Sequence, residues 1–248
     1  MRNYSAFAQY YDALTDNVEY EKRCDYVLEL FKRNGAQPKL VLDLACGTGS
    51  LSIALAKRGF DVIGVDASED MLSIAHQKVA EEGESILFLC QKMQKLDLYG
   101  TIDAAICTLD SINHLLADKD VIEAFKKVSL FLNPNGYFIF DVNTEYKHRC
   151  VLGNNTFVYD TESVFCVWQN EYDEKKNSTT IKLDFFELID GVYERSSESF
   201  AERAYSIENL TKWLQKAGLE VVGIFDEMTF SEPAETSERV FFVAKKHE

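Results

Sequence analysis

A glycine-rich turn between a buried strand and a helix is the feature that most constrains the fold. The run Leu40–Ala45 is apolar apart from Asp43, and it leads into the turn Cys46–Gly49. About one helix later, a second apolar run ends in Asp66. Glycines at such a turn let a ligand approach the backbone, and an acid at the end of the second strand binds a ribose. The pattern therefore predicts a βαβ unit that binds a nucleoside.

Strand-like and helix-like segments alternate from residue 40 to residue 141. The strand-like runs are apolar without in/out alternation, which is typical of parallel strands covered on both faces. We therefore expect an α/β fold with a Rossmann-like, doubly wound core. The predicted strands are Leu40–Ala45, Phe60–Val65, Ile86–Cys90, Ile102–Thr108 and Tyr137–Asp141, and the predicted helices between them are Leu51–Arg58, Glu69–Glu82 and Val121–Leu132.

The pattern changes between about residues 155 and 205, where longer runs with mixed alternation predict an antiparallel β meander. Asp190-Gly191 is a two-residue hairpin signal within it. We expect residues 1–150 and 206–248 to form the core with an N-terminal helical cap, and residues 151–205 to form an inserted meander. The predicted meander strands are Ser163–Tyr172, Thr179–Leu188 and Tyr193–Tyr205; a helix over Ser206–Gly218 and strands Glu220–Phe225 and Arg239–Ala244 follow, giving about seven core strands.

Charge and composition limit the partners of this chain. The formal net charge is −15 and the pI is near 4.7, whereas a nucleic-acid binder needs a basic surface. No run of 18 apolar residues occurs, and residues 1–12 lack the hydrophobic core of a secretion signal. The six cysteines lack metal-site spacing, so no metal is expected. We expect a cytoplasmic protein with a small-molecule substrate, either monomeric or homodimeric.

Two classes of cofactor fit the glycine turn. Nicotinamide and flavin folds place G-x-G-x-x-G here, and this chain has Gly47 and Gly49 with Ser52 at the third position. The acid about twenty residues further on fits both classes. The turn by itself therefore leaves an NAD-type oxidoreductase open.

The same turn resembles motif I of the class I S-adenosylmethionine-dependent methyltransferases, hydrophobic-hydrophobic-Asp-x-Gly-x-Gly-x-Gly. Asp43, Gly47 and Gly49 fit this motif, and Ala45 stands where its first glycine usually does. S-adenosylmethionine carries an amino-acid zwitterion and a sulfonium in place of a pyrophosphate. An acid ahead of the glycines suits it, because the acid favours the ligand's ammonium directly or through water.

Further runs extend the resemblance to nearly the whole chain. Gly64–Leu72 is similar to the family's G-x-D-x-S-x-x-M-L run, which implies that Asp66 binds both ribose hydroxyls. Phe88–Gln94 aligns with the segment whose backbone reads the adenine edge, although Lys92 replaces the usual acid there. Phe7–Asp12 resembles the F-A-x-x-Y-D segment of small-molecule members. The cofactor-binding residues implied are Tyr11, Asp43, Ala45, Gly47, Gly49, Asp66, Ala67, Met71, Met93, Gln94 and Leu109.

Methyl transfer mainly requires that acceptor, methyl carbon and sulfur be aligned, and a base only if the acceptor starts protonated. His114, just after the fourth predicted strand, and Tyr11 are the catalytic candidates. His114 fits equally a loop histidine that caps the helix beginning near Asp118. Asp110 and Asp141 also end strands, where carboxylates either serve a site or cap the next turn.

The meander would stand over the acceptor pocket, and Trp168, Arg203 and Tyr205 are its substrate candidates. Aromatic residues in a sheet often serve packing, and Arg203 has a possible partner in Glu202. The chain is therefore identified as a methyltransferase that acts on an amine or hydroxyl of a small molecule, similar to sugar-amine and glycine N-methyltransferases. An oxidoreductase, disfavoured by Asp43 and Ser52, and a cofactor-binding domain without transfer activity are the alternatives.

Overall fold

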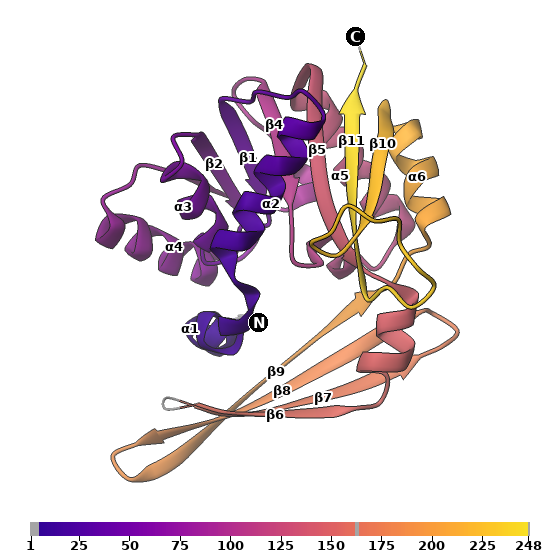
Figure 1. Ribbon diagram of the computed structural model, residues 1–248. Helices are drawn as coiled ribbons and strands as arrows, with labels where there is room; N and C mark the ends of the chain where they lie inside the picture. Colours follow the sequence, from indigo (N-terminus) through magenta and orange to yellow (C-terminus); the bar gives the residue numbers. More distant parts are fainter. Residues whose placement is uncertain (1–4, 162–163, 248) are drawn as a thin grey trace.

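The computed structural model describes residues 5–161 and 164–247. A seven-stranded sheet flanked by helices forms the larger part, and a four-stranded sheet lies beyond one end of it (Figure 1). Helix α1 (Ser5–Leu14) lies between these two parts, where Phe7 and Tyr10 pack with Met71 of the core and Phe185 of the small sheet. The candidate site lies where the three parts meet.

The large sheet has the strand order β10-β11-β5-β4-β1-β2-β3. Strands β1 to β5 pair in parallel, and β11 runs antiparallel to both β5 and β10. This arrangement confirms the predicted Rossmann-like sheet of seven mostly parallel strands. Its strands are β1 (Leu40–Leu44), β2 (Asp61–Asp66), β3 (Leu87–Cys90), β4 (Ile102–Cys107), β5 (Leu132–Asn143), β10 (Leu219–Asp226) and β11 (Arg239–Lys246).

Helices cover both faces of this sheet, as a doubly wound fold requires. One face packs against α2 (Tyr20–Arg33) and α3 (Ser50–Ala56), and the other packs against α5 (Asp118–Phe131) and α6 (Ile207–Lys216). Helix α4 (Glu69–Glu82) packs on α3 and β3. Four shorter helical segments are η1 (Asp16–Val18), η2 (Met93–Lys95), η3 (Ser111–His114) and η4 (Lys147–Leu152).

Local sequence explains where the helices beside the site begin and end. The Ser68 side chain accepts a hydrogen bond from the Met71 amide at the start of α4, and Gly83 ends that helix with a φ of 70°. Ser206 caps α6 in the same way, through the Asn209 amide, as the sequence predicted. Strand β5 begins at Leu132, five residues before the predicted strand. The segment Asn133–Gly136, which was predicted to end the preceding helix, is part of β5, and the pairing of β5 with β4 is irregular there.

The inserted sheet has the order β6-β7-β8-β9 and is antiparallel throughout. The prediction of three strands was wrong, because β6 (Thr156–Asp160) precedes them. Neither face of β6 is fully buried, so its sequence carries little apolar signal. The predicted hairpin at Asp190-Gly191 is present, with φ values of 49° and 81°. The other strands are β7 (Phe165–Asp173), β8 (Ser178–Ile189) and β9 (Val192–Arg203); Ser163 lies outside the described residues.

The strand order reverses between β1 and β4, since the chain continues from β1 to β2 on one side and returns to β4 on the other. Open α/β sheets hold ligands beyond the carboxyl ends of the strands at such a switch point. Helix α1 and the inserted sheet lie over this end of the large sheet (Figure 1). Within the part of the chain described, no helix has the length and apolar composition to cross a membrane.

Candidate active site

A cleft of about 760 Å³ opens at the carboxyl ends of β1, β2 and β4. This volume lies in the range of small-molecule sites. The cleft is lined by five segments: α1, the glycine turn, the end of β2 with the start of α4, the segment from the end of β3 into η2, and the loop after β4. The lining residues are Phe7, Tyr11, Ala45, Gly47, Asp66, Ala67, Ser68, Glu69, Asp70, Met71, Cys90, Gln91, Lys92, Met93, Gln94, Leu109, Ser111, His114 and Leu115.

Asp66 ties the glycine turn to the start of α4. One carboxylate oxygen, Oδ2, accepts a hydrogen bond from the Gly47 amide at 2.9 Å, and Oδ1 accepts one from the Ser68 amide at 2.8 Å. Burial raises the pKa of this carboxyl, while these backbone hydrogen bonds lower it. The residue both shapes the turn and presents a partly exposed carboxylate to the cleft.

The turn itself is built from left-handed backbone. Ala45, Gly47 and Gly49 have φ values of 61°, 55° and 77°. Ala45 thus adopts a conformation that an L-residue with a Cβ enters only at a cost of roughly 1–2 kcal/mol. Gly49 lies outside the cleft lining, and a Cβ there would lie 3.0 Å from the Cβ of Ala75. Its role is close packing between α3 and α4.

Asp43 lies under the turn, beside a small cavity of about 30 Å³ that adjoins the cleft through Tyr11, Ala45 and Leu109. Its carboxylate Oδ2 accepts a hydrogen bond from Ser52 Oγ at 2.5 Å. The cavity has room for a water molecule, which is one route from this carboxylate to a ligand. Burial raises the pKa of Asp43 to about 7, against the hydrogen bond from Ser52, which lowers it.

This raised pKa predicts how stability depends on pH. The unfolded carboxyl titrates near pH 3.9, so between about pH 4 and pH 7 the folded state binds more protons and becomes less stable as the pH rises. We expect Asp43→Asn to be more stable than the native protein at pH 8, with a gain of up to roughly 1.4 kcal/mol for each unit of pKa shift removed. Urea unfolding at pH 5 and pH 8, with exposed Asp61→Asn as control, measures this. A variant with the native pH slope would contradict the prediction.

Helix α1 is fastened over the cleft by Asp12. Its Oδ1 accepts a hydrogen bond from Thr48 Oγ1 at 2.8 Å, and its Oδ2 pairs with Lys78 Nζ at 2.7 Å. These contacts join α1 to the glycine turn and to α4. They hold Phe7 and Tyr11 in the cleft wall.

The loop after β4 is held in a strained conformation by one buried carboxylate. Leu109 and Asp110 both have positive φ, at 57° and 53°. Their amides donate hydrogen bonds to Asp141 Oδ2 and Oδ1 at 2.9 and 2.8 Å. Asp141, which is fully buried, also pairs with the guanidinium groups of Arg23 and Arg239. The conformation of the loop thus depends on a residue of β5.

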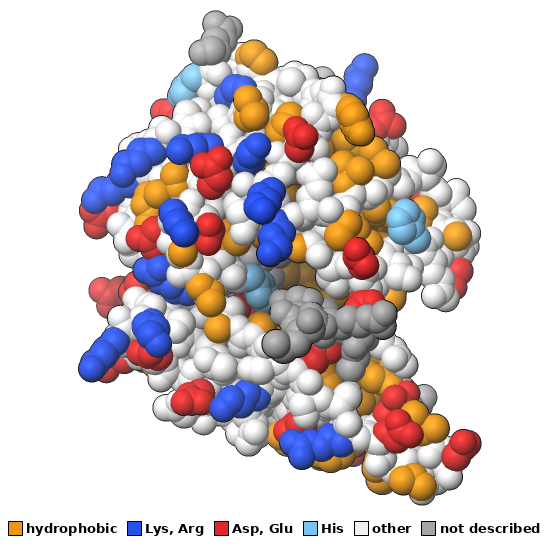
Figure 2. Space-filling view, turned by 180° about the vertical axis from the view of Figure 1, so that it is seen from behind, with side chains coloured by type: hydrophobic (Ala, Val, Ile, Leu, Met, Phe, Trp, Pro, Cys, Tyr) orange, Lys and Arg blue, Asp and Glu red, His pale blue; other side chains and the backbone are white. Residues whose placement is uncertain are grey.

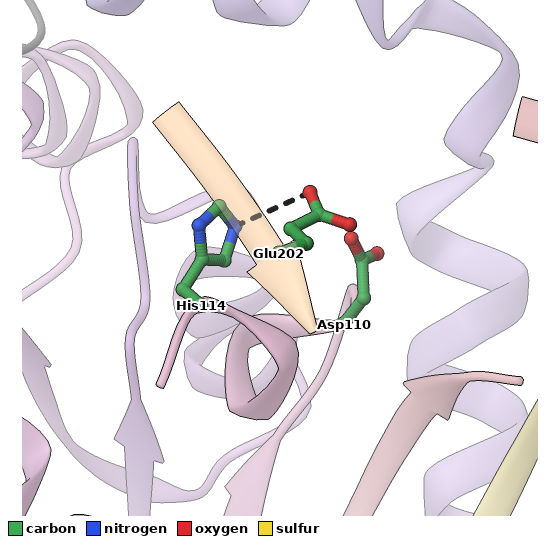
Figure 3. A group of neighbouring side chains, drawn as sticks. All are labelled: Asp110, His114 and Glu202. Carbon is green, nitrogen blue, oxygen red and sulfur yellow. Dashed lines mark ion pairs between the residues drawn. The ribbon is translucent and has the colours of Figure 1, made fainter. Parts of the chain in front are cut away.

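Asp110, His114 and Glu202 form a cluster beside this loop, with one ligating atom of each within 4.8 Å of the others. Figure 3 shows the His114 ring turned toward the Glu202 carboxylate, with Asp110 on the other side of that carboxylate. His114 Nε2 lies 3.7 Å from Glu202 Oε1. Asp110 Oδ1 pairs with Arg239 Nη2 at 2.7 Å, and the pKa of Asp110 is lowered to about 2, with burial acting against Arg239.

The structure brings most of the predicted cofactor and catalytic residues into one cleft wall. Asp43 adjoins the cleft through the small cavity, and Gly49 packs behind the turn. The predicted residues that line the cleft are Tyr11, Ala45, Gly47, Asp66, Ala67, Met71, Met93, Gln94, Leu109 and His114.

The three predicted substrate residues are outside the cleft lining and contact other protein groups. Trp168 donates a hydrogen bond from Nε1 to Asn170 Oδ1 at 2.6 Å. Arg203 pairs with Asp118 at 2.7 Å rather than with Glu202. Tyr205 is buried, where it donates to the Leu115 carbonyl. These contacts give all three a structural role.

Ser111, Leu115 and Glu202 were not among the predicted site residues. Ser111 and Leu115 lie close to His114 in the chain, so their position beside a predicted catalytic residue is a signal that points to them. Glu202 lies almost 90 residues further along, at the end of β9. No motif links it to the loop after β4, and only the docking of the insertion brings it there.

Comparison with known proteins identifies relatives. Residues 41–136 match a family described as a methyltransferase domain. A protein of Geobacillus sp. (strain WCH70) named as a methyltransferase is 37% identical over 245 residues, which cover 98% of this chain and 99% of that protein. A crystal structure of an S-adenosylmethionine-dependent methyltransferase from Clostridium acetobutylicum is 33% identical, covers 98% of both chains and superposes with a TM-score of 0.89.

A more distant similarity covers about half of the chain. A glycine/sarcosine N-methyltransferase from Parasynechococcus marenigrum (strain WH8102) is 35% identical over 139 residues, 54% of this chain and 48% of that protein.

Proposed function

Because the chain belongs to the S-adenosylmethionine-dependent methyltransferases, we propose that it transfers the methyl group of that cofactor to an amine or hydroxyl of a small molecule. One observation carries the choice of substrate class. The acid proposed to hold the ribose, Asp66, and the candidate base, His114, line the same cleft. Cofactor and acceptor would therefore share one cleft of a volume suited to small molecules.

The adenosine half of the cofactor would lie against the carboxyl ends of β2 and β3. There Asp66 accepts hydrogen bonds from the ribose hydroxyls, and Ala67 and Met71 lie against the adenine faces. The backbone of Met93 and Gln94 reads the adenine edge. The methionine half would lie against Ala45, Gly47 and Leu109, with Asp43 favouring its ammonium through the small cavity. Its sulfonium methyl would then point toward Tyr11 and His114.

An amine acceptor is favoured over an anionic one. Asp66, Glu69 and Asp70 line the cleft, and Lys92 is the single lysine or arginine among its described lining residues. A protein that is similar to this chain over about half of its length is named a glycine/sarcosine N-methyltransferase. The name says that a nitrogen atom, the amine nitrogen of such a substrate, receives the methyl group. An amine arrives mainly protonated, so it requires a base before it attacks the methyl carbon.

The cleft supplies the two things that transfer needs, alignment and a proton acceptor. Alignment of nucleophile, methyl and sulfur contributes roughly 7–11 kcal/mol in well-oriented reactions. Tyr11, held by the α1 contacts, closes the cleft over the reacting atoms. His114 accepts the proton of the acceptor. Burial lowers the pKa of His114, which keeps the imidazole neutral and able to act as a base.

The distribution of surface charge bears on which partners the protein binds and where it is located. Figure 2 shows Lys and Arg side chains interspersed with Asp and Glu on one face, in place of one continuous basic patch. Together with a net charge of −15, this supports a protein that acts on small molecules rather than nucleic acids. We propose a cytoplasmic location, which fits these features.

Turnover tests this proposal. The purified protein, S-adenosylmethionine and a panel of amino acids, amino sugars, polyamines and hydroxy acids are combined, and the release of S-adenosylhomocysteine is measured. We expect release with one or more amines, and loss of it in His114→Asn by about 100-fold. Exposed His247→Asn is the matched control. Binding of S-adenosylhomocysteine without turnover on any acceptor would favour the alternative of a binding domain without transfer activity.

A further inference from the structure

Glu202 of β9 contacts His114 and is not among the residues that line the cleft. Its side chain is 5% exposed, whereas that of His114 is 35% exposed and lines the cleft. Oε1 of Glu202 faces His114 Nε2 at 3.7 Å (Figure 3). This distance is just beyond a hydrogen bond, and such contacts often tighten only when substrate is bound. The imidazole therefore stands between the cleft and a buried carboxyl.

The second oxygen of Glu202 faces another histidine. His148, whose side chain is fully buried, places Nε2 at 3.9 Å from Glu202 Oε2. Neither of these two atoms has a hydrogen-bond partner among the described residues. The other nitrogen of His148, Nδ1, lies 2.9 Å from Thr179 Oγ1 on β8, which fixes the ring. Buried polar atoms normally have a hydrogen-bond partner, so these two facing atoms have an unmet requirement that a proton between them would satisfy.

Glu202 and Asp110 differ in whether a cationic side chain is paired with them. Asp110 is neutralised by Arg239, which also pairs with Asp141 and Glu227. Glu202 has no Lys or Arg partner among the described ion pairs, and burial raises the pKa of its carboxyl well above the usual range. Burial lowers the pKa of both histidines. The charged or polar groups that face this pair from neighbouring elements are Asp66, Asp110, Asn143, Lys147, His148 and Arg239.

We propose that Glu202 is the positioning residue of His114: in its ionised form, which is the active one, its carboxylate accepts the Nε2–H of the imidazole, aims the Nδ1 lone pair at the acceptor, and takes up the proton that the reaction releases. The inference rests on the proposed function, in which His114 is the base. It assigns a role in methyl transfer to the inserted sheet, since Glu202 lies on β9 and Thr179, which fixes His148, lies on β8.

The acceptor ammonium gives a proton to His114 Nδ1, and its freed lone pair attacks the methyl carbon. The carbon–sulfur bond breaks, its electron pair stays on sulfur, and the sulfonium becomes a neutral thioether. The Nε2 proton of the imidazolium moves toward Glu202, whose high proton affinity makes it the better holder. The acceptor thus loses one proton, and the His114–Glu202 pair, which already held the Nε2 proton, gains it.

A divalent cation is the competing occupant of the same cluster. Two carboxylates and a histidine are suitable ligands for a transition metal. However, Arg239 already occupies one oxygen of Asp110 at 2.7 Å, and a guanidinium at that position repels a second cation. The arrangement therefore favours a shared proton over a bound metal ion at this cluster. Stoichiometric metal binding would contradict the proposal and is measured below.

The first arm of the test needs no acceptor. In protein labelled with ¹³C-histidine, the His114 ring resonance is assigned by its loss in His114→Asn and is titrated in the native protein and in Glu202→Gln. Because the buried Glu202 carboxyl binds a proton before the imidazole does, the first proton taken up by the pair belongs to both groups. We expect the His114 resonance of the native protein to show a titration step about one pH unit or more above that of Glu202→Gln, and this step should be absent in the variant. Glu194→Gln, exposed on the same strand, should leave it unchanged.

The second arm uses the acceptor found by the turnover screen. We expect Glu202→Gln to lower kcat by about 100-fold, to leave the KM for S-adenosylmethionine unchanged, and to remove the limb that the pair contributes to the pH profile of kcat. A merely structural role would not move that limb. Absence of turnover in the native protein counts against the proposed function and leaves the titration arm intact.

Two results would overturn the inference. One is a His114 titration that is the same in the native protein and in Glu202→Gln. The other is stoichiometric binding of Mn²⁺ or Zn²⁺ to the native protein that Glu202→Gln abolishes and Glu194→Gln preserves, because the cluster would then be a metal site.

Discussion

Replacement of Asp66 by alanine is expected to weaken the binding of S-adenosylhomocysteine by about 100-fold or more. Hydrogen bonds to a charged group contribute about 1.5–3 kcal/mol each, and the proposed ribose contacts use two. A loss of about 3 kcal/mol corresponds to about 100-fold in Kd. The variant also frees the Gly47 and Ser68 amides, which now donate to this carboxylate. Isothermal titration calorimetry measures the change.

Two further variants make this result specific. Asp61→Ala alters an exposed carboxylate at the other end of the same strand and should bind like the native protein. Asp66→Asn keeps one oxygen as an acceptor but loses the charge, so its affinity should lie between those of the native protein and Asp66→Ala. An affinity of Asp66→Ala within threefold of the native value, about 0.7 kcal/mol, would remove Asp66 from the ribose site.

Replacement of Asp141 by alanine is expected to lower the free energy of unfolding by about 3–5 kcal/mol. This carboxylate accepts two backbone amides of the strained loop and pairs with Arg23 and Arg239. Its removal leaves both guanidinium groups, which are themselves buried, with fewer anionic partners. Urea unfolding followed by circular dichroism and tryptophan fluorescence gives the change.

A second substitution separates charge from packing at this position. Arg23→Met in the Asp141→Ala background removes a buried guanidinium whose one remaining carboxylate among the described ion pairs, Glu227, is still paired with Arg239, so the double variant should recover part of the loss. Exposed Asp160→Ala on β6 is the control and should change stability by less than about 0.5 kcal/mol. A loss below about 1 kcal/mol in Asp141→Ala would show that the loop holds its conformation without this residue.

The core of the fold was predictable because its strands carry a strong local signal. Strands buried on both faces read as continuous apolar runs, and the helix between residues 69 and 82 has a serine before it and a glycine after it. Strand β6 was missed for the opposite reason. Its residues alternate between exposed and half-buried, so tertiary pairing with β7 rather than burial makes it a strand.

The residues of the candidate site were likewise predictable only where a local sequence pattern places them together. Asp43, Asp66 and the glycine turn stand within one βαβ unit, so sequence spacing alone places them together. The substrate candidates on the insertion could not be placed in this way. Arg203, the last residue of β9, reaches Asp118, and Tyr205, two residues later, reaches the Leu115 carbonyl, because the end of β9 packs against the loop after β4 and the start of α5.

The sequence by itself determined the unit that binds the cofactor, because the glycine turn and the acid end consecutive strands of one βαβ unit. The cofactor class followed from the resemblance of several further runs to the methyltransferases, since the turn and the acid alone fit two classes. The sequence did not reveal which side chains surround His114. That environment depends on Glu202 and His148, which lie 88 and 34 positions away and approach His114 only when the inserted sheet packs over the switch point. Local patterns specify elements and their turns, whereas long-range burial decides which charges face one another and which atom holds a proton.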